Sequence, residues 1–218
     1  MNPISASSER PESLLFLPGA AGDRRMWQAV AAGLTHRGPR RLFGWPGFGG
    51  VPADPNVRGI SDLVARVVES IQGPTLLFAQ SMGGVIAMQT ALAKPREVRG
   101  LVLAVTSGGI DTRALGASDW RAAFRKANPN LPTWFEDERE DLSARLAEIQ
   151  IPVLLLYGDA DPISPVRVGE RLAELLPSAE LVVISGGTHG LVSERASEVT
   201  AHVERYLRGL GATQKLDG

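Results

Sequence analysis

Residues 78–84 read Phe-Ala-Gln-Ser-Met-Gly-Gly, and this stretch decides how the chain folds. An apolar run at 75–79 leads into Ser81, and a stretch that is apolar almost all round follows at 82–93. A buried strand, a tight turn and a buried helix are the parts of a parallel α/β sheet, where such a turn holds a hydroxyl at the carboxyl edge of the strands. Small residues at Ala79 and Gly83 let strand and helix approach closely around the turn. The alternative is a serine that only caps a helix.

Five more apolar runs of strand length recur along the chain, at residues 14–17, 41–43, 98–105, 153–157 and 181–184. None of them alternates strictly between apolar and polar residues, which is typical of strands buried on both faces. Helical patterns separate most of these runs, and a last helix with charge on one face is expected at about 193–210. The sequence therefore predicts a mainly parallel sheet of about six strands with helices on both faces.

Length and composition agree with one such domain. The chain has 218 residues, of which 44% are hydrophobic and 22% charged, as in a globular chain with a sizeable core. We expect a polar leader at 1–12 and a single α/β domain at 13–218. The 23 basic and 24 acidic side chains leave a net charge of −1, which argues against a nucleic-acid partner.

Residue content also excludes several kinds of site. The chain has no cysteine, so it can form no disulfide, thiolate nucleophile or sulfur-ligated metal site. Surface or packing roles suffice for His36 and His202, two of the three histidines, so we predict neither a metal centre nor a cofactor. The first residues lack a signal peptide's features, and no apolar run reaches the roughly 18 residues of a membrane span. We therefore expect a soluble, cytoplasmic protein with no membrane partner.

Ser81 is followed along the chain by two aspartates and a histidine, each just after an apolar run. Asp159 and Asp161 follow the run at 153–157, and His189 lies between glycines after the run at 181–184. Parallel strands bring their carboxyl ends to one edge of the sheet, so these side chains are expected to converge. A serine nucleophile, a histidine base and a carboxylate that orients the base make up a catalytic triad. Spacing alone leaves either aspartate as the acid.

This pattern resembles the α/β-hydrolase family, from about residue 13 to the final helix. Residues 158–165 match the family's acid loop, Gly-x-x-Asp-x-x-x-Pro, which implies that Asp161 is the triad acid and Asp159 a turn or capping carboxylate. Leu-Pro-Gly-Ala at 17–20 occupies the place of the family's His-Gly-x loop. By that likeness the backbone N–H groups of Ala20 and Met82 would form the oxyanion hole.

Further loops extend the resemblance, and some positions depart from it. Trp-Pro-Gly-Phe-Gly at 45–49 looks like the family's x-Pro-Gly-x-Gly loop, and with Ser-Met-Gly-Gly at 81–84 it is also similar to pimeloyl acyl-carrier-protein methyl esterases. Pro18 replaces the usual histidine, Gly44 stands where an aspartate is common, and Ala79 replaces a glycine. None of these changes removes a group that does chemistry. The polar leader is too short for the two strands that commonly precede this core, so we expect a trimmed sheet.

The resemblance implies a serine hydrolase that cleaves a carboxylic ester of a small molecule through an acyl-enzyme on Ser81. Family members that use an aspartate nucleophile, the haloalkane dehalogenases and epoxide hydrolases, are disfavoured by the serine. Cofactor-free perhydrolases and lyase or synthase members share the Ser, Asp, His set and remain alternatives, as does a ligand-binding receptor with little turnover. The glycine-rich strings at 19–22 and 44–50 lack the residues and context of a nucleotide-binding loop.

The segment at about 107–149 shows no strand pattern and is predicted to be a small helical lid. Helices are expected at 119–127 and 136–149, with a turn between them at Asn-Pro-Asn-Leu-Pro. Aromatic residues of a lid above the strand ends would either bind substrate or pack on the core, and the candidates for substrate binding are Trp120, Phe124 and Trp134. The lid arginines Arg113, Arg121 and Arg125 would either recognise a substrate carboxylate or a phosphopantetheine carrier, or simply belong to solvated helix faces. We favour solvated faces, and we assign Trp27 to the core.

Overall fold

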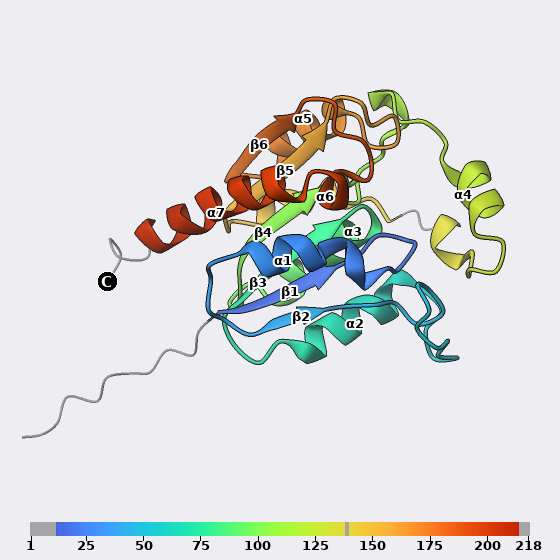
Figure 1. Cartoon of the computed structure of the whole chain (residues 1–218), viewed down its shortest axis with the longest axis horizontal. Helices are drawn as coiled ribbons and strands as arrows, with labels where there is room; N and C mark the ends of the chain where they lie inside the picture. Colours follow the sequence, from blue (N-terminus) through green and yellow to red (C-terminus); the bar gives the residue numbers. More distant parts are fainter. Residues whose placement is uncertain (1–11, 138–139, 214–218) are drawn as a thin grey trace, which may run out of the picture.

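The computed structural model describes residues 12–137 and 140–213, and its centre is a six-stranded parallel sheet (Figure 1). The strands lie in the order β2-β1-β3-β4-β5-β6, and every neighbouring pair is parallel. Their bounds are β1 Ser13–Leu17, β2 Arg40–Leu42, β3 Thr75–Gln80, β4 Val98–Ala104, β5 Val153–Gly158 and β6 Ala179–Ile184. The predicted parallel sheet of about six strands is confirmed.

Helices cover both faces of the sheet. Their bounds are α1 Gln28–Gly33, α2 Ile60–Ser70, α3 Met82–Ala93, α4 Arg121–Ala127, α5 Val166–Leu175, α6 Leu191–Glu194 and α7 Ala196–Thr213. Four short 3-10 turns add η1 Arg24–Trp27, η2 Arg113–Leu115, η3 Trp134–Asp137 and η4 Leu146–Glu148. Within 12–137 and 140–213, no helix has the length and hydropathy needed to cross a membrane.

Two hydrophobic cores form because strand side chains alternate between the faces. On β1, Leu15 and Leu17 pack in a core with α2, α3 and α5, whereas Leu14 and Phe16 pack in another core with α1, α6 and α7. Trp27 is fully buried in the second core, as predicted. The central strands β3 and β5 are buried along their whole length, which explains why their sequences show no alternation.

Two predicted features differ at the edges of the sheet. The edge strands β2 and β6 are only partly buried, and Val183 on β6 is 46% exposed, because an edge strand has a neighbour on one side alone. The expected helix at about 193–210 is two helices, α6 and α7, since the backbone of Arg195 between them leaves the helical region. The predicted leader, apart from Glu12, lies outside the described residues.

The lid segment is less helical than expected. Helix α4 begins at Arg121 rather than at 119, because the Asp119 carboxylate accepts the Arg121 N–H at 3.1 Å in the turn before the helix. The prediction of a helix at 136–149 is wrong for the described part of this segment, which leaves out residues 138–139. In the described part of this segment the short turns η3 and η4 form instead of a helix. Leu142 lies outside both turns and packs in the core with Leu146.

The carboxyl ends of the strands all point to one side of the molecule, and α4 lies beyond that side (Figure 1). The loops after β1, β3, β5 and β6 therefore meet at a single edge. This edge carries the site described next.

Candidate active site

The turn between β3 and α3 holds Ser81 in a strained backbone conformation. Its φ is +52° and its ψ is −122°, a region that residues with a side chain rarely occupy and that is typical of functional positions. Gly83 in the next turn is required by contact, because a Cβ there would lie 2.6 Å from the carbonyl oxygens of Leu17 and Pro18. Helix α3 thus lies close to the end of β1 and the loop after it, whereas the sequence predicted only a close approach of strand and helix around the turn.

A buried hydrogen-bond network lies beneath this turn, and sequence reasoning missed it. The Thr106 hydroxyl donates to the Ser81 carbonyl oxygen at 2.6 Å, and the Tyr157 hydroxyl donates to the Thr106 carbonyl oxygen. Burial raises the pKa of the Tyr157 phenol, so this hydroxyl stays a donor. Val105 just before Thr106 is fully buried and has a φ of +41°, a strained value for a β-branched residue. These hydrogen bonds join the Ser81 turn to Thr106, which follows β4, and to Tyr157 on β5.

The structure brings Ser81, His189 and Asp161 together in one chain of contacts. His189 Nε2 lies 3.0 Å from Ser81 Oγ, and His189 Nδ1 lies 2.8 Å from Asp161 Oδ2. The Asp161 side chain is fully buried, and its other oxygen accepts the Ile163 N–H at 2.8 Å. A carboxylate held in this way orients the imidazole so that its far nitrogen faces the hydroxyl.

Asp159 lies in the same loop but has a different task. Its carboxylate accepts the Gly186 N–H at 2.6 Å and the Ser185 hydroxyl at 3.2 Å, so it joins the loop after β5 to the loop after β6. Of the two aspartates that spacing left open, Asp161 is the one beside His189. His36 accepts the Gly38 N–H in a loop, and His202 lies on α7.

The loop after β1 lies beside Ser81, where the sequence predicted it. A Cβ on Gly19 would stand 3.2 Å from the Ser81 Cβ. The Trp45 indole donates to the Pro18 carbonyl oxygen at 3.0 Å and fixes this loop. Within the described residues, the N–H groups of Ala20 and Met82 donate to no backbone or side-chain acceptor.

The predicted lid aromatics pack on one another. Trp120 is stacked on Phe135 with centroids 5.8 Å apart, and Phe124 meets both rings edge-on. Trp134 contacts Phe135 and also Phe48, which comes from the Pro-Gly-Phe-Gly loop after β2. We call these five rings the aromatic cluster. The sequence gives Trp120, Phe124 and Trp134 as substrate-binding candidates and Phe135 only as a further lid aromatic, and it does not predict that Phe48 joins them.

Each lid arginine that the sequence singled out has a carboxylate partner. Arg113 pairs with Asp111 and Arg121 with Asp119, both across two residues. Arg125 reaches across the lid to Glu136, whose side chain is buried, at 2.6 Å. The prediction that these arginines belong to solvated faces fits Arg113 and Arg125, whose side chains are mostly exposed. Arg121 is more covered, and its guanidinium also lies over the Trp120 ring.

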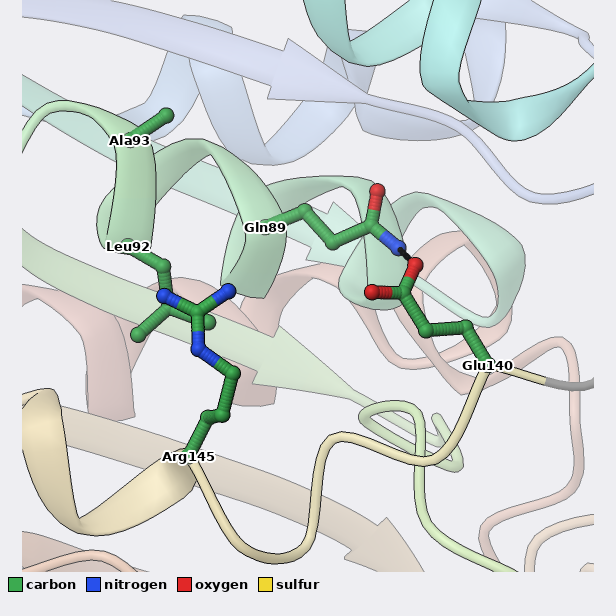
Figure 2. A pocket seen from close by; sticks show the side chains of 5 residues that line it. All are labelled: Gln89, Leu92, Ala93, Glu140 and Arg145. Atoms are coloured by element: carbon green, nitrogen blue, oxygen red, sulfur yellow. Dashed lines mark hydrogen bonds between the residues drawn. The ribbon is translucent and has the colours of Figure 1, made fainter.

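Surface hollows lie beside α3 and beside β2. Figure 2 shows one of about 200 Å³ between the last turns of α3 and the segment at 140–145, where the Gln89 amide donates to the Glu140 carboxylate at 2.5 Å. A second, of about 270 Å³, lies beside β2 and is lined in part by Phe43 and Trp45. Within the described residues, no group of three or more His, Cys, Asp or Glu side chains could hold a metal ion.

Comparison with known proteins agrees with this geometry. Residues 14–136 match the model of the alpha/beta hydrolase family, and residues 122–215 match that of TAP-like proteins. A pimeloyl-[acyl-carrier protein] methyl ester esterase of Neisseria meningitidis serogroup C is 24% identical over an alignment 245 residues long. The alignment covers 91% of this chain and 94% of the relative.

Solved structures show the same fold at low sequence identity. A thermophilic esterase from Thermogutta terrifontis superposes with a TM-score of 0.77 at 22% identity, over 91% of this chain and 90% of the other. An esterase from Rhodococcus sp. ECU1013 gives a TM-score of 0.71 at 19% identity, over 93% and 92%. The family model covers more than half of the chain and includes β1, β3 and the Ser81 turn. The chain belongs to the α/β-hydrolase family.

Proposed function

We propose that this protein is a serine hydrolase that cleaves a carboxylic ester of a small molecule through an acyl-enzyme on Ser81. The observation that carries the proposal is the continuous series of contacts from Ser81 through His189 to the buried Asp161. A serine hydroxyl is a weak nucleophile at neutral pH, and an adjacent base that removes its proton activates it. The names of the relatives, which include esterases, support the same reaction class.

The first half of the reaction forms the acyl-enzyme. Ser81 Oγ attacks the ester carbonyl carbon while its proton passes to His189 Nε2, and Asp161 stabilises the resulting imidazolium. The carbonyl oxygen becomes an oxyanion, which the N–H groups of Ala20 and Met82 would stabilise; one such donor is typically worth about 3 kcal/mol. The C–O bond to the alcohol then breaks, and the imidazolium gives its proton to the leaving alkoxide oxygen.

The second half uses the same groups on water. His189 removes a proton from a water molecule, whose oxygen attacks the acyl carbon, and the same two N–H groups would hold the second oxyanion. The bond to Ser81 Oγ breaks, and His189 returns the proton to that oxygen. The carboxylic acid leaves and the enzyme is restored.

The lid supplies the apolar groups of the proposed substrate-binding site. The aromatic cluster contains Trp120, Phe124 and Trp134, and it is joined to the catalytic edge through Phe48. Binding sites for small esters are mostly apolar with a few placed polar groups. We assign the acyl chain to the cluster's side of the site, so Trp120→Ala is expected to raise KM more for longer acyl chains than for acetyl. An equal change for all chain lengths would contradict this assignment.

The test is covalent labelling of the folded protein with a fluorophosphonate, followed by mass-spectrometric mapping. A stoichiometric adduct on Ser81, together with hydrolysis of a p-nitrophenyl ester, is the expected result. Ser81→Ala should lose both, whereas Ser70→Ala, which removes a hydroxyl bonded within α2, should keep both. A Ser81→Ala variant with undiminished turnover, or a folded wild-type protein that neither reacts nor hydrolyses esters, would refute the proposal and favour a receptor or a non-hydrolytic enzyme.

A further inference from the structure

Gln80 is a buried polar residue that the proposed mechanism does not use. It is the last residue of β3, directly before Ser81, and it is 4% exposed. Its side-chain amide donates to the main-chain carbonyl oxygen of His189 at 3.0 Å. We infer that Gln80 is a positioning residue for His189, joining the strand that carries the nucleophile to the loop that carries the base. This inference rests on the proposed function.

The loop that carries His189 is anchored at several points, and Gln80 acts on the histidine itself. Asp159 holds the start of the loop through Gly186. At its other end, Thr188 accepts the Gly190 N–H and donates to Glu194. The hydrogen bonds of these two anchors go to residues other than His189. The Gln80 bond fixes the His189 carbonyl, and through it the Cα from which the imidazole projects toward Ser81.

The same side chain also contacts the loop on the other side of the nucleophile. A Cβ on Gly19 would collide with the Gln80 side-chain oxygen and would stand 3.2 Å from the Ser81 Cβ. Gln80 therefore lies between the loop that contains Ala20 and the loop of His189. One buried amide thus touches both segments that must hold their places around the hydroxyl.

The geometry explains why a small displacement matters. Proton transfer requires His189 Nε2 within hydrogen-bond reach of Ser81 Oγ, and the two atoms lie 3.0 Å apart. A misplacement of about 1 Å at a reacting group can cost on the order of 100-fold in rate. Loss of the Gln80 donor would also leave the His189 carbonyl without this partner, which drives the loop toward another position.

Two substitutions separate the donor from the shape of the side chain. Gln80→Met removes the donor and keeps a similar length, whereas Gln80→Glu keeps the shape and can donate to the His189 carbonyl only while its carboxyl is protonated. The matched control is Gln89→Met, which removes a glutamine hydrogen bond to Glu140 at the far end of α3. Each variant is compared with wild type for its melting temperature, the number of serines titrated by fluorophosphonate, and kcat and KM for a p-nitrophenyl ester.

Gln80→Met is expected to lower kcat per titrated serine by about 10-fold or more with KM within about twofold of wild type, since only the transfer geometry changes, and Gln80→Glu should lose kcat in the same way when its carboxyl is ionised. Gln89→Met should keep both constants. Gln80→Met activity equal to wild type would overturn the inference, and an effect confined to KM or to the melting temperature would equally overturn it. Absence of labelling and hydrolysis in wild type would refute the proposed function instead, so the two failures are distinct.

Discussion

Replacing Asp161 by asparagine tests the orientation of His189 with a change of a single atom. The carboxylate has two neighbours, His189 Nδ1 at 2.8 Å and the Ile163 N–H at 2.8 Å, and both oxygens act as acceptors. An asparagine has one acceptor oxygen and one NH2 donor, so it cannot satisfy both neighbours in the buried site.

The two orientations of that amide have different costs. When the asparagine NH2 faces His189, the Nδ1 atom must accept a hydrogen bond, so the imidazole carries its proton on Nε2. In this tautomer Nε2 cannot remove the Ser81 proton, which typically lowers kcat by about 10⁴. With its NH2 toward the Ile163 N–H, two buried donors face each other, which costs about 1–3 kcal/mol. The first orientation is expected to dominate, so Asp161→Asn should lower kcat by roughly 10³ to 10⁴.

Asp159→Asn is the matched control, because it makes the same change two residues away on an exposed side chain. The amide oxygen can still accept the Gly186 N–H, and the Ser185 hydroxyl can turn to accept, so kcat should stay within about threefold of wild type. The assay is p-nitrophenyl ester hydrolysis on variants whose folding is verified by circular dichroism. If Asp161→Asn kept more than a tenth of wild-type kcat, or if Asp159→Asn lost as much activity, the assigned geometry would be wrong.

Three other perturbations follow from contacts described above. Gly83→Ala places a methyl group 2.6 Å from two backbone oxygens, so it should destabilise the fold by about 1–3 kcal/mol in urea unfolding; an unchanged midpoint would contradict the close approach. Thr106→Val removes the donor to the Ser81 carbonyl, so the free energy of unfolding should fall by about 1–3 kcal/mol in the same assay. Thr106→Ser keeps a hydroxyl and should largely retain the wild-type value. Hydrogen bonds from Arg113 lower the pKa of Asp111 from its ordinary value of 3.8 to about 2. The pair therefore stabilises the folded state fully above pH 3.8, and this stabilisation is lost as the pH falls toward 2. Carboxyl NMR titration should find that the Asp111 pKa rises in Arg113→Ala but stays below 3.8, because the backbone N–H of residue 113 still donates to this carboxylate, and an unmoved value would exclude the Arg113 guanidinium as the main cause.

The sheet was predictable from the sequence because its central strands are buried on both faces and so appear as unbroken apolar runs. The convergence of Ser81, Asp161 and His189 was predictable for a related reason: each follows a parallel strand, and parallel strands end at one edge. The choice between Asp159 and Asp161 came from the likeness to the family, and the contact to His189 agrees with it.

The lid was less predictable because long-range contacts override local pattern there. Leu142, Leu146 and Ile149 have helical spacing, yet Leu142 donates its N–H to the Gly109 carbonyl oxygen and inserts beside that glycine. A helix through Leu142 would give up this contact, and the burial it brings outweighs the local propensity. The strained Val105 and the Gln80 bond to His189 have no signal in the sequence either, since both depend on residues far along the chain.

The order of the three strand ends has a consequence for biosynthesis. Ser81 leaves the ribosome 108 residues before His189, a delay of roughly 5–20 s at ordinary rates of synthesis. Asp161 and His189 follow β5 and β6, which are the last two strands in the sheet order and the last two that are synthesised. On the proposed mechanism, a nascent or truncated chain that ends before β6 holds a serine with no base. Esterase activity would therefore appear only when the final third of the protein has been made, and incomplete chains would not hydrolyse the cell's esters.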